Sequence, residues 1–282
     1  MGTPKRERQR NLRAAKQAVQ AAEIKTDHRR HQLRQVVLVV GTVFAAGLVV
    51  YLLGNRGGDD QAGSATTTSI PTETTVVTTI AAAQATSTAL FRSQPTACGK
   101  TLPPEPKQMS FTAPEDQVIP PDAIVTATLV TSCGEIVLTL DPKAAPKTVN
   151  SFVFLARQGF YDGAPFHRVI PGFMAQGGDP TGAGTGGPGY SLPDENLPTA
   201  TPSYPRGLAA MANSGANTSG SQFFLMLADT PLPANYSVFG MVASGLETLD
   251  AIAQIPMGLS GNNEQSRPLQ SVYLEKVTVS VS

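Results

Sequence analysis

Chemically reactive side chains are scarce in this 282-residue chain, which has three histidines, two cysteines and no tryptophan. His28 and His31 lie in a basic N-terminal segment, so His167 is the only histidine available to the rest of the chain. A Ser-His-Asp triad would have to use His167, yet the G-x-S-x-G motif typical of many such hydrolases is absent. The same count excludes metal sites built from clustered histidines. It does not exclude calcium sites built from carboxylates.

Charge is also sparse, and its distribution is uneven. The formal net charge is zero, but residues 1–35 carry ten basic and three acidic side chains, a balance of +7. The rest of the chain therefore carries −7. A negatively charged main body argues against DNA or RNA as a partner.

Residues 36–53 contain no charged side chain at all. At a rise of about 1.5 Å per residue, a helix of this length spans about 27 Å, which is just enough for a bilayer core of about 30 Å. The positive-inside rule then places residues 1–35 in the cytoplasm, in contact with anionic lipid, and the rest of the chain outside the cell membrane. A cleavable signal peptide is the alternative, although its charged region would be unusually long and no A-x-A site follows directly. A buried core helix is a further alternative.

Residues 54–121 are rich in Thr, Ser and Ala and then in Pro, and they predict a flexible stalk. Such a composition buries too little apolar surface to offset the loss of chain entropy. Cys98 and Cys133 both lie on the predicted external side, where a disulfide is favoured over two buried thiols. In the chain-entropy model, a loop of this size contributes roughly 3–4 kcal/mol.

Residues 122–282 predict a mainly β domain. Ile124–Thr131 and Glu135–Leu140 indicate a hairpin, and apolar spacing indicates helices at 145–158 and 245–254. Further strands are expected at 165–170, 173–176, 207–212, 222–228, 238–242 and 272–281. A closed β-barrel is the natural way for such a set of strands to remove its edges.

The stretch 182–187 satisfies the pattern G-x-G-x-x-G, which is found in dinucleotide-binding sites. Such a site needs a helix directly after the glycines. Here Pro188 and Gly189 follow at once and prevent a helix. The stretch is therefore interpreted as a loop.

Three separated blocks carry a resemblance to a known family. The first block, residues 166–179, reads Phe-His-Arg-Val-Ile-Pro-Gly-Phe-Met-Ala-Gln-Gly-Gly-Asp. The second, residues 211–224, reads Met-Ala-Asn-Ser-Gly-Ala-Asn-Thr-Ser-Gly-Ser-Gln-Phe-Phe, and the third, residues 238–240, reads Val-Phe-Gly. In order and spacing they resemble the cyclophilin family of peptidyl-prolyl cis/trans isomerases, over residues 122–282. The resemblance implies a closed eight-stranded antiparallel β-barrel capped by two α-helices. Together with the predicted span, it implies a membrane-anchored bacterial form.

The resemblance also implies roles for individual residues. Arg168 would be the catalytic residue, close to the prolyl nitrogen of the substrate. The substrate-binding residues would be Phe173, Met174, Gln176, Ala212, Asn213, Gln222, Phe224, Leu232 and Tyr236. The supporting residues beneath them would be Phe166, His167 and Phe223.

Two positions depart from the family pattern. Many family members have a tryptophan on the groove rim where Leu232 stands, and a histidine is frequent where Tyr236 stands. Loss of the indole N–H predicts weak binding of cyclosporin-type ligands. The expected partners are proline-containing segments of exported proteins, and no cofactor or metal is expected. A non-catalytic scaffold or holdase that binds proline-containing segments is the rival hypothesis.

Overall fold

The computed structural model describes residues 87–198, 203–261 and 263–282. The predicted span at 36–53, the basic segment and the first part of the predicted stalk lie outside these residues. Among the helices in the described ranges, none combines the length and the apolar character needed to cross a membrane.

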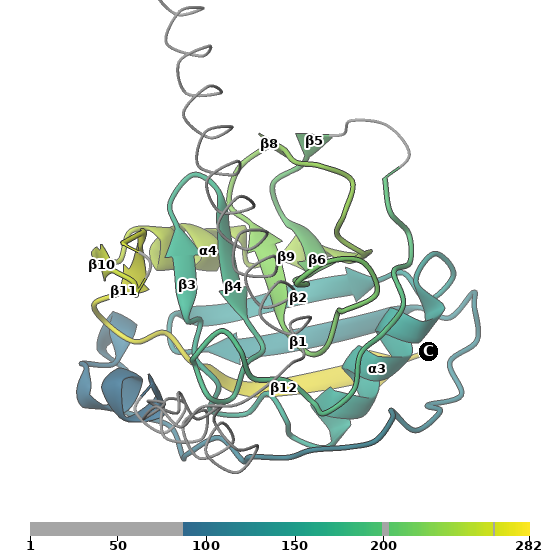
Figure 1. Ribbon diagram of the computed structural model, residues 1–282, viewed down its shortest axis with the longest axis horizontal. Coiled ribbons are helices and arrows are strands. Elements are labelled where there is room, and N and C mark those ends of the chain that lie inside the picture. Colours follow the sequence, from purple (N-terminus) through teal and green to yellow (C-terminus); the bar gives the residue numbers. More distant parts are fainter. Residues whose placement is uncertain (1–86, 199–202, 262) are drawn as a thin grey trace, which may run out of the picture. The chain divides into compact units, whose positions relative to one another are not determined.

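Eight strands form one antiparallel sheet, which curves around the core (Figure 1). In spatial order these strands are β12 (Leu274–Val281), β1 (Val125–Thr131), β2 (Gly134–Leu140), β9 (Val238–Ser244), β6 (Leu208–Met211), β7 (Phe223–Met226), β4 (Met174–Gly177) and β3 (Arg168–Ile170). Two helices accompany the sheet, α3 (Pro146–Arg157) and α4 (Leu246–Ala253). The predicted hairpin, both predicted helices and the mainly β character are confirmed.

Smaller elements also occur in the described part of the chain, where residues 87–93 are helical. A 3-10 turn, η1, covers Ala97–Gly99. Two short antiparallel pairs lie outside the main sheet: β5 (Ser203–Tyr204) with β8 (Thr230–Pro231), and β10 (Met257–Leu259) with β11 (Gln265–Pro268). Neither pair was expected from the sequence.

The expectation of a closed barrel requires correction. Among the described residues the hydrogen-bonded ladder ends at β3 on one side and β12 on the other. An isolated bridge between Pro165 and Tyr273 joins these two edges. Proline has no N–H to extend a ladder, and β3 is only three residues long. The sheet is therefore a half-barrel rather than a closed one.

The core lies between the curved sheet and helix α3. Every second residue of β1 is buried, which is the pattern of a strand with one face on a core. Helix α3 contributes Phe152, whose ring lies 5.1 Å from Tyr161, 5.7 Å from Phe223 and 5.3 Å from Phe239. These aromatic contacts tie α3 to strands β7 and β9.

Residues 87–121 pack against the body, and we call this segment the strap. Phe91 is only 3% exposed, and Ala97 is part of the core. The strap, dark blue in Figure 1, passes along one rim of the body toward α3. At Gly163 a Cβ atom would lie 2.6 Å from the carbonyl oxygen of Pro104, so the close approach requires glycine. Residues 87–121, which composition had assigned to a flexible stalk, are therefore packed onto the folded body.

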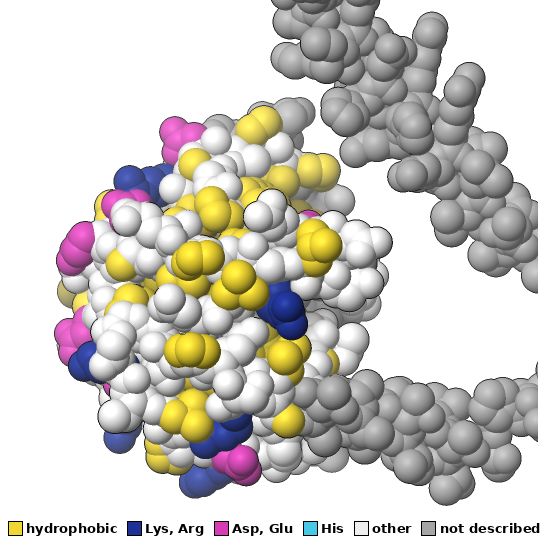
Figure 2. Space-filling view, turned by 90° about the vertical axis from the view of Figure 1, so that its left-hand side faces the viewer, with side chains coloured by type: hydrophobic (Ala, Val, Ile, Leu, Met, Phe, Trp, Pro, Cys, Tyr) yellow, Lys and Arg dark blue, Asp and Glu magenta, His cyan; other side chains and the backbone are white. Residues whose placement is uncertain are grey.

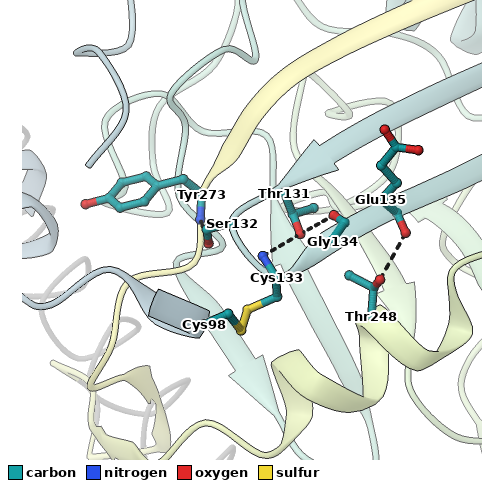
Figure 3. Close-up of a disulfide and its surroundings, with 8 residues drawn as sticks. All are labelled: Cys98, Thr131, Ser132, Cys133, Gly134, Glu135, Thr248 and Tyr273. Atoms are coloured by element: carbon teal, nitrogen blue, oxygen red, sulfur yellow. Dashed lines mark hydrogen bonds between the residues drawn. A yellow bond between two sulfur atoms is a disulfide. The ribbon is translucent and has the colours of Figure 1, made fainter. Parts of the chain in front are cut away.

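The predicted disulfide between Cys98 and Cys133 is present and ties the strap to the β1–β2 turn (Figure 3). The hydroxyl of Thr131 donates to the carbonyl of Gly134 at 2.7 Å and accepts the N–H of Cys133 at 3.1 Å. Thr248 of α4 donates to the carbonyl of Glu135 at 3.0 Å. The strap, this turn and α4 thus form one connected unit.

Candidate active site

A cavity of about 150 Å³ opens beside strands β3, β4 and β7. Its lining consists of nine residues, all predicted from the sequence: Arg168, Phe173, Met174, Gln176, Ala212, Asn213, Phe224, Leu232 and Tyr236. The remaining predicted substrate-binding residue, Gln222, lines the neighbouring hollow. We call the smaller cavity the apolar pocket, because aromatic and aliphatic side chains form most of its wall.

Strand register brings the central residues of the apolar pocket together. Arg168 on β3 pairs with Gln176 on β4, and Gln176 pairs with Phe224 on β7. Residues opposite one another in adjacent strands point to the same face of a sheet. Met174, two residues before Gln176, lies on that face as well, whereas Ala175 between them faces the core.

Arg168 is held by a residue that the sequence analysis missed. Its Nε and Nη2 atoms donate to the two carboxylate oxygens of Glu264, at 2.6 and 2.8 Å. Its Nη1 atom lies 3.5 Å from Oε1 of Gln176 and 4.0 Å from Sδ of Met174. The hydrogen bonds from Arg168, more than any other contact, lower the pKa of Glu264 below its ordinary value. The guanidinium is thus paired along one edge and directed toward the apolar pocket along the other.

A larger polar hollow of about 560 Å³ adjoins the apolar pocket. Gln176, Ala212 and Asn213 line both cavities, so the two are parts of one groove. The remaining lining of the polar hollow comes from the glycine-rich loop, here residues 179–191, and from residues 214–222. Its wall is therefore rich in backbone N–H and C=O groups.

Two glutamine amides connect the apolar pocket to the glycine-rich loop. Nε2 of Gln176 donates to Oε1 of Gln222 at 2.9 Å, and Nε2 of Gln222 donates to the carbonyl of Gly186 at 2.9 Å. Each amide is fixed by its neighbour, so their remaining polar groups are already oriented. Such groups are suited to holding the backbone of a bound peptide.

Asp179 shapes the glycine-rich loop, and the sequence analysis did not single it out. Its fully buried carboxylate accepts bonds from the N–H and hydroxyl of Thr181 at 2.8 and 2.7 Å. It also accepts the N–H groups of Gly184 at 2.8 Å and Gly186 at 3.0 Å. An aspartate two residues after a strand, followed by Pro, Thr and Gly, is a turn signal that could have indicated this role.

The three predicted supporting residues lie beneath the groove. Phe166 and Phe223 are fully buried, with ring centroids 6.4 Å apart. Both ring nitrogens of His167 are buried and have no hydrogen-bond partner among the described residues. Burial, assisted by Arg168 and opposed by Asp179, lowers the pKa of His167 to about 4. The imidazole is therefore neutral at pH 7.

No group of three or more His, Cys, Asp or Glu side chains that could hold a metal ion occurs among the described residues.

The family to which the chain belongs follows from comparison with known proteins. Residues 126–279 match the family model described as cyclophilin type peptidyl-prolyl cis-trans isomerase/CLD. The chain is a member of this family.

Individual relatives agree with the family match. The chain is 44% identical over 180 residues to the probable peptidyl-prolyl cis-trans isomerase B of Mycobacterium tuberculosis, a match that covers 58% of each chain. It is 45% identical over 171 residues to the peptidyl-prolyl cis-trans isomerase B of Streptomyces anulatus, covering 54% of this chain and 95% of the relative. The similarity thus spans little more than half the length of the mycobacterial relative.

Solved structures show the same fold. A crystal structure of a cyclophilin type peptidyl-prolyl cis-trans isomerase from Cryptosporidium parvum matches with 32% identity and a TM-score of 0.51. The match covers 56% of this chain and 98% of the parasite protein. A second crystal structure, of that protein in the presence of the dipeptide Ala-Pro, matches with a TM-score of 0.50.

Proposed function

We propose that the protein is a peptidyl-prolyl cis/trans isomerase with Arg168 as its catalytic residue. The main support is the position of the guanidinium, which forms part of the wall of a small apolar pocket beside Phe173 and Phe224. Family membership supports the same reaction, and a related protein was crystallised in the presence of Ala-Pro.

The reaction requires rotation about an amide bond. Resonance imposes a barrier of about 18–20 kcal/mol on this rotation and leaves little basicity on the prolyl nitrogen. In the twisted state resonance is lost, and the lone pair returns to that nitrogen. A donor aimed at this atom forms its full hydrogen bond only in the twisted state, which is how binding lowers a barrier.

Each part of the groove has a task in this mechanism. The apolar pocket holds the pyrrolidine ring, while Nη1 of Arg168 donates to the prolyl nitrogen as the bond twists. The amides of Gln176 and Asn213 hold the chain next to the proline, so that one side of the bond stays fixed while the other turns. No covalent bond is formed to the enzyme, and no proton is transferred.

The full chain in detergent tests this proposal, with NMR exchange measured on a short X-Pro peptide. Arg168→Ala should lower the catalysed exchange rate by about 100-fold or more, as for removal of a transition-state donor in other enzymes. Arg206→Ala is the matched control, because Arg206 forms a surface ion pair with Asp250 at 2.7 Å. Equal rates for Arg168→Ala and the unmodified chain would refute the isomerase. Retained peptide binding would then favour a non-catalytic scaffold.

We further propose that the enzyme is anchored in the cell membrane and acts on exported proteins. The basic segment 1–35, with affinity for anionic lipid, and the uncharged stretch 36–53 support this topology. A disulfide between Cys98 and Cys133 is consistent with an oxidising compartment. Protease added to intact cells should degrade the residues after the predicted span. Complete protection, lost only after lysis, would contradict the orientation.

A further inference from the structure

The ion pair of Arg168 and Glu264 has a directional geometry. Arginine offers five N–H donors in a rigid plane. Glu264 accepts one from Nε and one from Nη2, which fixes both the plane of the guanidinium and its rotation within that plane. The two donors on Nη1 then lie on the edge next to Gln176 and Met174, which both line the apolar pocket.

A dedicated hairpin holds Glu264 in place. The residue lies just before β11, in the turn that connects β10 and β11. Its carbonyl accepts bonds from both the N–H and the hydroxyl of Ser260, at 2.8 and 3.0 Å. The N–H of Asn263 donates to the carbonyl of Ser260 at 3.0 Å, with Asn263 at φ 60°. The turn is therefore defined by its own backbone bonds and presents the carboxylate to β3.

The surroundings favour a persistent pair. The side chains of Arg168 and Glu264 are 35% and 30% exposed, so the contact is partly shielded from solvent. Few charged side chains lie toward the middle of the face that carries β10 and β11 (Figure 2). His167 next to the pair is neutral at pH 7, and the lowered pKa of Glu264 keeps its carboxylate ionised.

We propose that Glu264 is a positioning residue for isomerisation, because its carboxylate locks Arg168 in the orientation that directs Nη1 into the apolar pocket. This inference rests on the proposed function. Without Glu264, the long arginine side chain would sample several rotamers, and freezing it would cost up to about 2 kcal/mol at each turnover. The directed hydrogen bond, and not the net charge of Arg168, is what the twisted amide requires, so partial neutralisation by Glu264 is compatible with catalysis.

Replacement of Glu264 in the full chain tests the proposal in the NMR exchange assay. Glu264→Ala should lower kcat by about tenfold, since misplacing a catalytic group by about 1 Å costs up to 100-fold. KM should change less than twofold, because the apolar pocket stays intact. Glu264→Gln should have a smaller effect, since its amide oxygen still accepts one bond. Asp250→Asn breaks the comparable pair of Arg206 and should leave both constants unchanged.

A spectroscopic readout separates positioning from a general structural role. The Nε–H signal of Arg168 should exchange slowly with water in the unmodified chain and rapidly in Glu264→Ala. In an Arg168→Ala background, Glu264→Ala should have no further effect on kcat, because the residue acts only through the arginine. Unchanged or increased kcat in Glu264→Ala, or an equal loss in both backgrounds, would overturn the inference. If Arg168→Ala itself had no effect, the proposed function would fail instead.

Discussion

The two parts of the groove are built in different ways. At the centre of the apolar pocket, the positions of the side chains follow from strand register, as in the row Arg168, Gln176 and Phe224. The polar hollow is lined mainly by a loop whose shape depends on one buried carboxylate, Asp179. A groove can thus combine a rigid part set by the sheet with a part that is set by a few hydrogen bonds.

The strap adds to this contrast, because it forms hydrogen bonds to the glycine-rich loop. The hydroxyl of Thr88 donates to the carbonyl of Thr181 at 2.9 Å, near the start of the glycine-rich loop. The N–H of Phe111 donates to the carbonyl of Pro188 at 2.7 Å, near its end. The polar hollow therefore depends on residues that precede the family domain, whereas the apolar pocket is contained within it.

Protonation of His167 should disturb both parts of the groove. The ring belongs to the residue next to Arg168, and a Cβ atom added at Gly184 of the glycine-rich loop would lie 3.6 Å from it. Its pKa is about 4 in the folded protein, whereas an unfolded histidine titrates near 6.5. The unfolded state therefore binds the proton first as the pH falls, and folding stability falls with it. The free energy of unfolding should decrease by about 2 kcal/mol between pH 7 and pH 5.

Urea unfolding followed by circular dichroism at these two pH values provides the measurement. His167→Gln is the control and should remove most of this pH dependence, because His167 is the only histidine after residue 31. The carboxylate of Glu264 titrates below this pH range, since its pKa is also lowered. If the free energy of unfolding of the unmodified chain were the same at pH 7 and pH 5, the buried ring would accept its proton without loss of stability, and the prediction would be wrong.

Adding one methyl group to the glycine-rich loop should separate the two parts of the groove. A Cβ atom at Gly186 would overlap the carboxylate of Asp179, whereas one at Gly187 would meet nothing within 4 Å. Gly186→Ala should therefore destabilise the fold by about 1–2 kcal/mol and distort the polar hollow. Turnover of long peptides should fall more than turnover of a short X-Pro peptide, as measured by NMR exchange. Gly187→Ala should match the unmodified chain, and equal losses for long and short peptides would contradict the separation.

The regular parts of the fold could be predicted because their patterns are local. The helix expected at 145–158 is observed at Pro146–Arg157, and the hairpin begins and ends within one residue of its expected bounds. The residues lining the apolar pocket were placed through the resemblance of three sequence blocks to the cyclophilin family. The pairing of β4 with β7 is consistent with Gln176 and Phe224 lying on one face.

The parts that could not be predicted depend on contacts between distant residues. Glu264 lies 96 residues after Arg168, in a hairpin whose strands have no apolar alternation to reveal them. The strap has a proline-rich composition typical of flexible chains, yet Phe91 and Ala97 fill sites on the core. Composition describes the average of a segment, whereas a few well-placed apolar residues and a disulfide are enough to order it.

The smallest predicted effect concerns the rim of the apolar pocket at Leu232. Leu232→Trp adds an indole N–H at a partly buried position beside Tyr236 and Phe224. One additional hydrogen bond contributes about 1 kcal/mol, so a cyclosporin-type ligand should bind roughly fivefold more tightly. Turnover of an X-Pro peptide should change less than twofold, because Arg168, Phe173 and Phe224 in the apolar pocket are unaltered. Calorimetric titration measures the affinity, with Leu232→Phe as the control that supplies an aromatic ring without a donor. If Leu232→Phe increased the affinity for the ligand by the same factor, the added ring surface would account for the effect, and the hydrogen bond would not.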